Sequence, residues 1–175
     1  MRNQQDFSRN NEQYFFNAAT INRTLATMFS YEYPHPAVTV DVAVFCLNEG
    51  SMKLLLIKRA NYPDAGKWAL PGGFIEIDED LEPAARRELA EETGLVVGEL
   101  EQLQTFGNPD RDPRERVITV VYTTIVDPGN TNVSASTDAA EAAWFDTRTL
   151  PELAFDHSHI IGLACDRIMS KLGNE

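Results

Sequence analysis

The sequence predicts an α/β domain of the α+β type, a sandwich in which helices flank a mixed β-sheet. Two observations predict this fold class. Runs rich in β-branched residues recur between turn residues, which is typical of strands. Two other stretches carry apolar side chains at helical spacing. At 175 residues, the chain is long enough to bury roughly 70% of its unfolded surface within one domain.

Five strands and two helices are expected along the chain. The strands are predicted at residues 38–47, 53–59, 101–106, 117–126 and 142–145. The sequence Asn48-Glu49-Gly50 is typical of a hairpin turn between the first two strands. The helices are predicted at 81–93 and from about 158 to 172, where the later stretch has a broad apolar face.

The helix at 81–93 has clear start and stop signals. Asp80 can cap its N-terminus, Pro83 falls in the first turn where a missing N–H is harmless, and Gly94 can adopt the left-handed conformation that ends a helix. Just before it, residues 70–74 (Leu-Pro-Gly-Gly-Phe) predict a tight loop whose backbone can approach a ligand closely.

Three carboxylates share one face of this helix. Glu88, Glu91 and Glu92 stand at positions i, i+3 and i+4, and side chains at that spacing are neighbours. Like charges so placed destabilise a helix by roughly 0.2–0.5 kcal/mol per pair unless a cation or a basic partner lies between them. Because carboxylate oxygens are hard ligands, the pattern favours Mg²⁺, with Mn²⁺ as an alternative. The alternative is that Glu91 and Glu92 form a solvated helix face.

The spacing of these residues resembles that of a known family. In order, the chain carries Gly73, five residues, Glu79, seven residues, Arg87-Glu88-Leu89, one residue, Glu91-Glu92, one residue and Gly94-Leu95. This pattern is similar to the complete Nudix box of the Nudix hydrolases, with no departure at any position. The resemblance extends from about His35 to the C-terminus. We therefore divide the chain into a Nudix domain at 34–175 and an N-terminal extension at 1–33, helical in part.

The resemblance implies a reaction and a ligand set. Nudix hydrolases cleave a nucleoside diphosphate that is linked to another moiety, with water attacking phosphorus and Mg²⁺ held by the box carboxylates. By similarity, the metal ligands are Glu88, Glu91 and Glu92, with the backbone carbonyl of Gly72 as a further one. Glu79 and Arg87 are expected to form an ion pair that orients these carboxylates.

The catalytic base is less well defined than the metal ligands. The catalytic set that we expect is Glu88, Glu91, Glu92 and Asp138. Glu91 is one candidate for the base, while Asp138 and Glu141 precede Trp144 and can reach the site from across the sheet.

Substrate choice must come from residues outside the box. The polar loop at 105–114, together with 35–41 and Phe155-Asp156-His157, resembles ADP-ribose pyrophosphatases and the related regulators of NAD metabolism. We expect substrate contacts from Arg59, Phe106, Arg111 and Arg116, with Phe106 or Trp68 available to stack on a base. The alternative is that the aromatic residues belong to the core and that the arginines are solvated loop charges.

The formal net charge of −12 argues against nucleic acid as a partner, because phosphate backbones are bound by clustered Lys and Arg. A small nucleotide substrate is compatible with it, since metal ions and a few arginines can offset phosphate charge locally. No apolar run approaches the roughly 18 residues of a membrane span. Cys46 and Cys165 lack metal-ligand spacing, so a cytoplasmic setting with reduced thiols is expected.

Two classes of function remain open. The first is a Mg²⁺-dependent pyrophosphohydrolase that converts ADP-ribose to AMP and ribose 5-phosphate, with nucleotide sugars or damaged nucleoside triphosphates as alternative substrates. The second is a non-catalytic sensor of ADP-ribose or a similar nucleotide. The related regulators carry a C-terminal winged-helix domain, and the 31 residues after Trp144 are expected to form one helix instead. A homodimer is expected because family members commonly dimerise.

Overall fold

The computed structural model describes residues 31–48, 50–134 and 139–173. The chain divides into two units, residues 1–34 and residues 35–175, and all the helices and strands described below belong to the second unit. Most of the predicted N-terminal extension lies outside the described residues.

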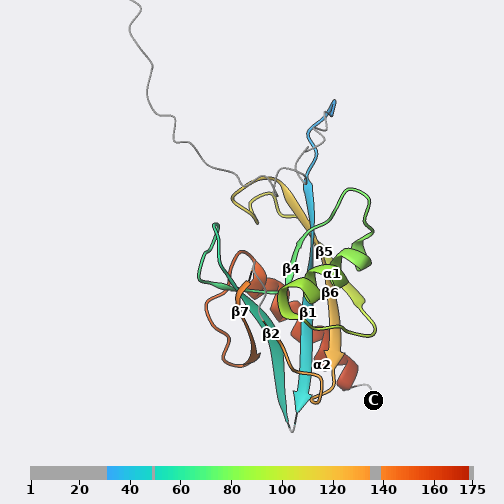
Figure 1. Ribbon diagram of the computed structural model, residues 1–175, viewed down its shortest axis with the longest axis vertical. Helices are drawn as coiled ribbons and strands as arrows, with labels where there is room; N and C mark the ends of the chain where they lie inside the picture. The colour runs from blue at the N-terminus through green and yellow to red at the C-terminus, as the bar shows by residue number, and fades with distance from the viewer. Residues whose placement is uncertain (1–30, 49, 135–138, 174–175) are drawn as a thin grey trace, which may run out of the picture. The chain divides into compact units, whose positions relative to one another are not determined.

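A mixed seven-stranded sheet forms the centre of the second unit (Figure 1). Its strands are β1 (Ala37–Asn48), β2 (Ser51–Arg59), β3 (Trp68–Ala69), β4 (Gly72–Phe74), β5 (Glu101–Phe106), β6 (Val117–Val126) and β7 (Ala139–Asp146). The main strand order is β3-β2-β1-β6-β5, while β4 pairs with β1 and β7 pairs with β2. Strand β1 is parallel to β6 and antiparallel to both β2 and β4, so it lies at the centre of the sheet.

Strand β1 is apolar on both faces because each face is covered by a helix. Successive side chains of a strand point to opposite faces, and the even positions from Val40 to Cys46 join one buried cluster, while Ala43 and Phe45 join another. A strand that is buried on both faces reads as a continuous apolar run, as this one does. The one charged residue in that run is Asp41, which is also buried.

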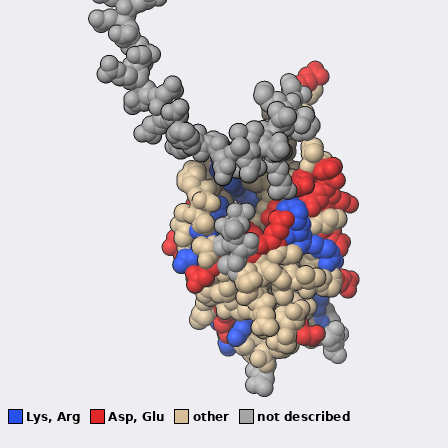
Figure 2. All heavy atoms as spheres, in the orientation of Figure 1, with Lys and Arg blue, Asp and Glu red and all other residues tan. Residues whose placement is uncertain are grey.

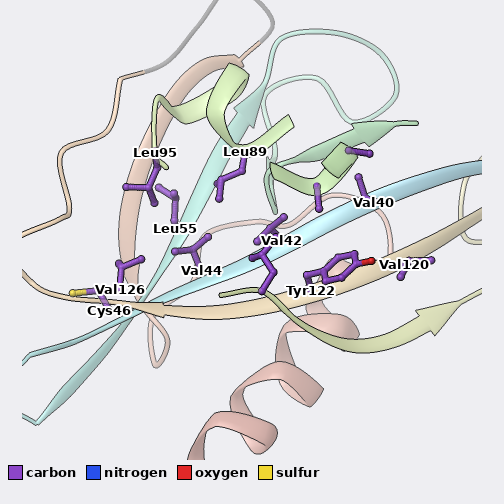
Figure 3. Close-up of a cluster of buried hydrophobic side chains, with 13 residues drawn as sticks. Val40, Val42, Val44, Cys46, Leu55, Leu89, Leu95, Val120, Tyr122 and Val126 are labelled. Atoms are coloured by element: carbon purple, nitrogen blue, oxygen red, sulfur yellow. The ribbon is translucent and has the colours of Figure 1, made fainter. Parts of the chain in front are cut away.

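Helix α1 (Leu81–Thr93) covers the first face. Its Leu89, together with Leu95, packs against Leu55 of β2 and Val42 of β1 (Figure 3). The helix begins and ends where its sequence predicts. Asp80 accepts a hydrogen bond from the Leu81 N–H at 2.7 Å, and Gly94 has a φ of 69°.

Helix α2 (His157–Leu172) covers the second face, with Ile160, Ile161 and Ile168 buried in the cluster that contains Phe45. The two helices therefore enclose the sheet from opposite sides, and the predicted fold class, a mixed sheet flanked by helices, is confirmed. Within the described residues, no helix is long and apolar enough to cross a membrane.

The predicted helices and strands agree with the structure to within a few residues, and two short strands were missed. The segments β3 and β4 contain two and three residues, and β4 begins with the glycines of the predicted loop. Glycine is a poor strand former in isolation. These segments are extended because they pair with β2 and β1, which is a tertiary contact.

Candidate active site

A cavity of about 380 Å³ opens beside the N-terminal part of β1, between α1, the β4 segment and the loops around residues 111 and 155. It is lined by carboxylates, glycines and an arginine of the predicted set together with one acid that was not predicted. These are Asp41, Arg59, Gly72, Gly73, Glu88 and Glu92.

Glu92 faces the glycine loop from α1. Its Oε2 accepts a hydrogen bond from the Gly72 N–H at 2.8 Å. Burial raises the pKa of Glu92 to about 8, and the nearby charges of Glu88 and Asp41 act in the same direction. The Gly72 N–H and Arg59 favour the charged form but do not outweigh burial. Without a cation, Glu92 is therefore protonated below about pH 8.

Glu88 lies directly over Gly73. A Cβ atom on Gly73 would fall 2.7 Å from the carboxylate of Glu88, so a side chain at this position would displace that carboxylate. Burial raises the pKa of Glu88, although Arg87 acts against this. At the preceding position, Gly72 has a φ of 155° and a Cβ there would meet the Val40 carbonyl oxygen at 2.1 Å. Gly72 is therefore required for the loop to contact β1, while Gly73 leaves room for the Glu88 carboxylate.

Arg87 ties the acidic residues of the box together. Its guanidinium donates to Glu79 at 2.8 Å, to Glu88 at 2.8 Å and to Glu91 at 3.2 Å. It also donates to the Phe74 carbonyl at 3.2 Å. Figure 2 shows Arg and Glu side chains next to one another over α1. These bonds raise the pKa of Arg87 and lower the pKa of Glu79. The predicted Glu79–Arg87 ion pair is thus present.

The donor set fits a hard divalent cation in its chemistry. Glu88, Glu92 and Asp41 line one cavity, and their mutual repulsion is what a divalent cation would relieve. Among the described residues, no three ligating side chains are already gathered at metal distance. Glu91 does not line the cavity, because its side chain is 61% exposed and is directed to Arg87. Its carboxylate must turn to join the other two.

The predicted substrate residues divide into two groups. Arg59 and Arg111 line the cavity. Arg111 is buried and bound through two nitrogens to Asp156, at 3.0 and 2.8 Å. It therefore supports the loop and has little freedom to turn toward a ligand.

Two candidates for the catalytic base precede Trp144. Asp138 lies outside the described residues, and Glu141 is paired with Lys58 at 3.3 Å on neighbouring strands.

Phe106 and Arg116 need correction, because neither lines the cavity. Phe106 ends β5 and is only 7% exposed, and it belongs to the α2 cluster, the buried cluster that contains Phe45 and Ile161. Trp68 packs edge-on against Phe145, with ring centroids 4.6 Å apart. Phe106 is thus a core residue, and Trp68 is partly buried against the same cluster. Arg116 is exposed beside Gly107.

Two residues that line the cavity, Asp41 and His157, were not predicted as site residues, although both fall in segments whose sequence resembles ADP-ribose pyrophosphatases. His157 Nδ1 accepts a hydrogen bond from the Leu70 N–H at 3.0 Å, and its Nε2 lies 3.7 Å from Asp41 Oδ1. Burial lowers the pKa of His157, so the ring is neutral and its one proton faces Asp41. The other oxygen of Asp41 accepts from the Thr119 hydroxyl at 2.5 Å. The signal available in the sequence was an aspartate within an apolar strand.

Comparison with known proteins agrees with this geometry. The NUDIX domain model matches residues 37–162. The chain is 48% identical over 129 residues to an ADP-ribose pyrophosphatase from Methanocaldococcus jannaschii, covering 74% of this chain and 73% of that protein. It is 36% identical over 150 residues to the ADPR responsive transcriptional repressor NtrR from Acinetobacter baylyi, covering 84% of this chain and 60% of the repressor.

A solved structure is also similar along most of its length. The NUDIX domain of Shewanella oneidensis NrtR, crystallised with ADP ribose, superimposes with a TM-score of 0.75 at 34% identity. The superposition covers 87% of this chain and 99% of that domain. The domain match spans well over half of the chain and includes every residue of the predicted box. The chain therefore belongs to the Nudix family.

Proposed function

We propose that this protein is a pyrophosphohydrolase that converts ADP-ribose to AMP and ribose 5-phosphate with Mg²⁺, or with Mn²⁺ in its place. The observation that carries the proposal is one cavity that combines the carboxyl groups of Glu88 and Glu92, whose pKa values are raised by burial, with the guanidinium of Arg59. A diphosphate bridged to a cation needs both kinds of group. The similarity to an ADP-ribose pyrophosphatase and to a domain crystallised with ADP ribose supports this substrate.

The carboxylates of α1 would hold the metal, with Glu88 and Glu92 in the cavity and Glu91 joining them. The Gly72 carbonyl is a further proposed ligand. When bound, a divalent cation neutralises the diphosphate and lowers the pKa of a water molecule. Arg87 orients Glu88 and Glu91 through its hydrogen bonds. Binding of the cation would also displace the proton that Glu92 holds below about pH 8.

The reaction adds water across one P–O bond of the anhydride. The water oxygen bonds to one phosphorus, the bridging oxygen leaves with the other phosphate, and a carboxylate takes the proton. Glu91, Asp138 and Glu141 are the proposed acceptors. Arg59 would bind phosphate oxygens as charge shifts onto the leaving phosphate.

A nucleotide sensor is the second proposed function, because the relatives include a repressor that responds to ADPR. Such a protein would bind ADP-ribose in the same cavity without turnover. Nucleotide sugars and damaged nucleoside triphosphates remain alternative substrates, since the box carboxylates would serve them equally well.

The first test is product release from ADP-ribose, nucleotide sugars, NADH, dinucleoside polyphosphates and nucleoside triphosphates, with Mg²⁺ or Mn²⁺. Glu92→Gln is measured beside the wild-type protein. Release of AMP and ribose 5-phosphate that is lost in the variant would support the hydrolase. Binding of ADP-ribose by calorimetry with no turnover of any compound would favour the sensor.

We also propose that the protein is a cytoplasmic homodimer that does not act on nucleic acid. Light scattering gives the mass in solution, and deletion of residues 1–30 tests their part in an interface. An unchanged mass after the deletion would remove that part of the proposal.

A further inference from the structure

Three consecutive residues each contact a different segment that lines the cavity. Phe155 contacts the segment at 59–67, Asp156 binds Arg111 in the loop after β5, and His157 binds the Leu70 N–H. The Phe155–Asp156–His157 segment therefore joins the parts of the cavity that lie outside α1.

The backbone of Phe155 is unusual. Within the described residues, Asp64 and Phe155 are the two non-glycine residues with positive φ, at 58° and 49°. These two residues bind each other, since the Phe155 N–H donates to Asp64 Oδ2 at 3.0 Å. This hydrogen bond is the largest cause of the lowered pKa of Asp64. Such backbone conformations persist only where the surroundings define them, and they gather at ligand sites.

Two guanidinium groups lie close to the ring of Phe155. The guanidinium carbon of Arg59 lies 4.7 Å from the ring centroid, and that of Arg114 lies 5.8 Å from it. Arg114 is also 5.2 Å from the centroid of Phe74. Distances within about 6 Å are those at which a cation is attracted to an aromatic face. One aromatic side chain thus keeps two like charges close together.

The two arginines differ in how far their charge is offset. Arg114 is bound through two nitrogens to Asp112, at 3.0 and 2.7 Å. Arg59 donates its Nε to the Pro63 carbonyl at 2.8 Å, and no carboxylate of the described residues is in salt-bridge range of it. Burial lowers the pKa of Arg59, and the charge of Arg114 lowers it further. An anion between them would relieve both effects.

We propose that Arg59, assisted by Arg114, forms an anion site that binds the phosphate oxygens of a nucleoside diphosphate. In this site Phe155 is the positioning residue, because its ring holds both guanidinium groups in place. Asp64 holds the backbone of Phe155 so that its ring reaches both guanidinium groups. This deepens the proposed function by naming what orients the substrate's diphosphate, and it rests on that function only for the identity of the natural substrate.

The test is calorimetric binding of ADP and of adenosine in EDTA, so that no metal contributes. The variants are Phe155→Leu, Phe155→Tyr and Arg59→Gln, with Arg148→Gln as the control because Arg148 is an exposed arginine paired with Asp146. We expect Phe155→Leu and Arg59→Gln to weaken ADP binding by about tenfold. Adenosine binding should be unchanged, Phe155→Tyr should restore ADP binding, and Arg148→Gln should behave as wild type.

Several outcomes would overturn the inference. They are an absence of ADP binding in the wild-type protein, an equal loss of adenosine binding in Phe155→Leu, and a failure of Phe155→Tyr to restore binding. If Phe155→Leu does not fold, Asp64→Asn takes its place, and unchanged ADP affinity in that variant would contradict the role of the ring's position. A wild-type protein that binds ADP through Phe155 but hydrolyses nothing would refute the proposed hydrolase and leave this inference standing.

Discussion

The cavity has two walls that are built differently. The carboxylate wall consists of Gly72, Gly73, Glu88 and Glu92, all within a short stretch of chain, whereas the arginine wall draws on residues 59, 111, 114 and 155 from three distant segments. The first wall is created by a loop followed by one helix. The second exists only after the sheet has formed. Residue spacing along the chain therefore predicts the carboxylate wall, whereas the arginine wall depends on contacts between distant segments.

The walls also differ in how their charges are satisfied. Asp156 and Asp112 each bind an arginine through two hydrogen bonds, so most of the arginine wall is organised by the protein itself. The carboxylate wall has no comparable basic partner at Glu92, whose pKa is raised to about 8. Without a cation, Glu92 of the carboxylate wall therefore holds a proton below about pH 8. In the arginine wall, two of the three arginines are instead paired with aspartates.

The largest expected effect is on the carboxylate wall itself. Glu92→Gln should lower kcat/KM for ADP-ribose on the order of 1000-fold, the scale of losing a group that stabilises transition-state charge. Glu82→Gln is the matched control, because Glu82 lies on the same helix and pairs only with Arg86. Steady-state kinetics with Mg²⁺ measure both. Equal rates for Glu92→Gln and wild type would exclude the carboxylate wall from catalysis.

A substitution in the glycine loop is expected to have the second largest effect. Gly72→Ala should destabilise the fold by about 2–3 kcal/mol, because its Cβ would meet the Val40 carbonyl oxygen at 2.1 Å at a φ of 155°. Gly98→Ala should be neutral, since nothing lies within 4 Å of the added Cβ. Urea denaturation in EDTA compares the two. If Gly72→Ala unfolds at the same urea concentration as wild type, the close contact between the loop and β1 is not required.

Loss of Arg87, which orients the proposed metal ligands, should have a smaller effect. Arg87→Gln should weaken Mn²⁺ binding by about 10- to 100-fold, because Glu88 and Glu91 lose the guanidinium that orients them. Arg86→Gln is the control, since the neighbouring Arg86 binds Glu82 and the Val97 carbonyl instead. Electron paramagnetic resonance measures free Mn²⁺. Similar affinities for the two variants would argue against the orienting role.

The smallest effect is on the pH dependence of stability without metal. Between the ordinary carboxyl pKa and about 8, Glu92 binds more proton in the folded than in the unfolded state, so rising pH lowers the free energy of unfolding. Thermal melts in EDTA from pH 6.5 to 8.5 should show a falling Tm that is absent in Glu92→Gln. His157 has a lowered pKa and binds less proton in the folded than in the unfolded state. Below pH 6.5 it therefore makes the free energy of unfolding rise with pH, which is opposite to the effect of Glu92. A flat profile in wild type would contradict the burial of Glu92.

The sequence anticipated elements whose signals lie within a few residues of one another. Asp80 and Gly94 mark the ends of α1, and the structure places both ends there. The predicted strands at 101–106 and 117–126 match β5 and β6, and the second of them is a run of mostly β-branched residues. The Glu79–Arg87 ion pair, which was expected by similarity to the Nudix box, is also present.

Sequence reasoning failed where a side chain's direction depends on distant packing. Phe106 stands in a polar, arginine-rich segment that resembles a binding loop, yet the pairing of β5 with β6 turns it into the α2 cluster. Asp41 stands in an apolar run that is typical of core, yet His157 and Thr119 satisfy it beside the cavity. No neighbouring residue in the sequence announces either environment.

The sequence by itself determined the carboxylate wall, because a helix with period 3.6 places Glu88 and Glu92 on one face wherever it folds. Only the tertiary structure decided the arginine wall, in which Arg59, Arg114 and Phe155 meet. The physical reason is the range of the interactions. Helix geometry and capping act over one or two turns of chain, whereas stacking and salt bridges join any residues that the packed sheet brings within a few ångströms.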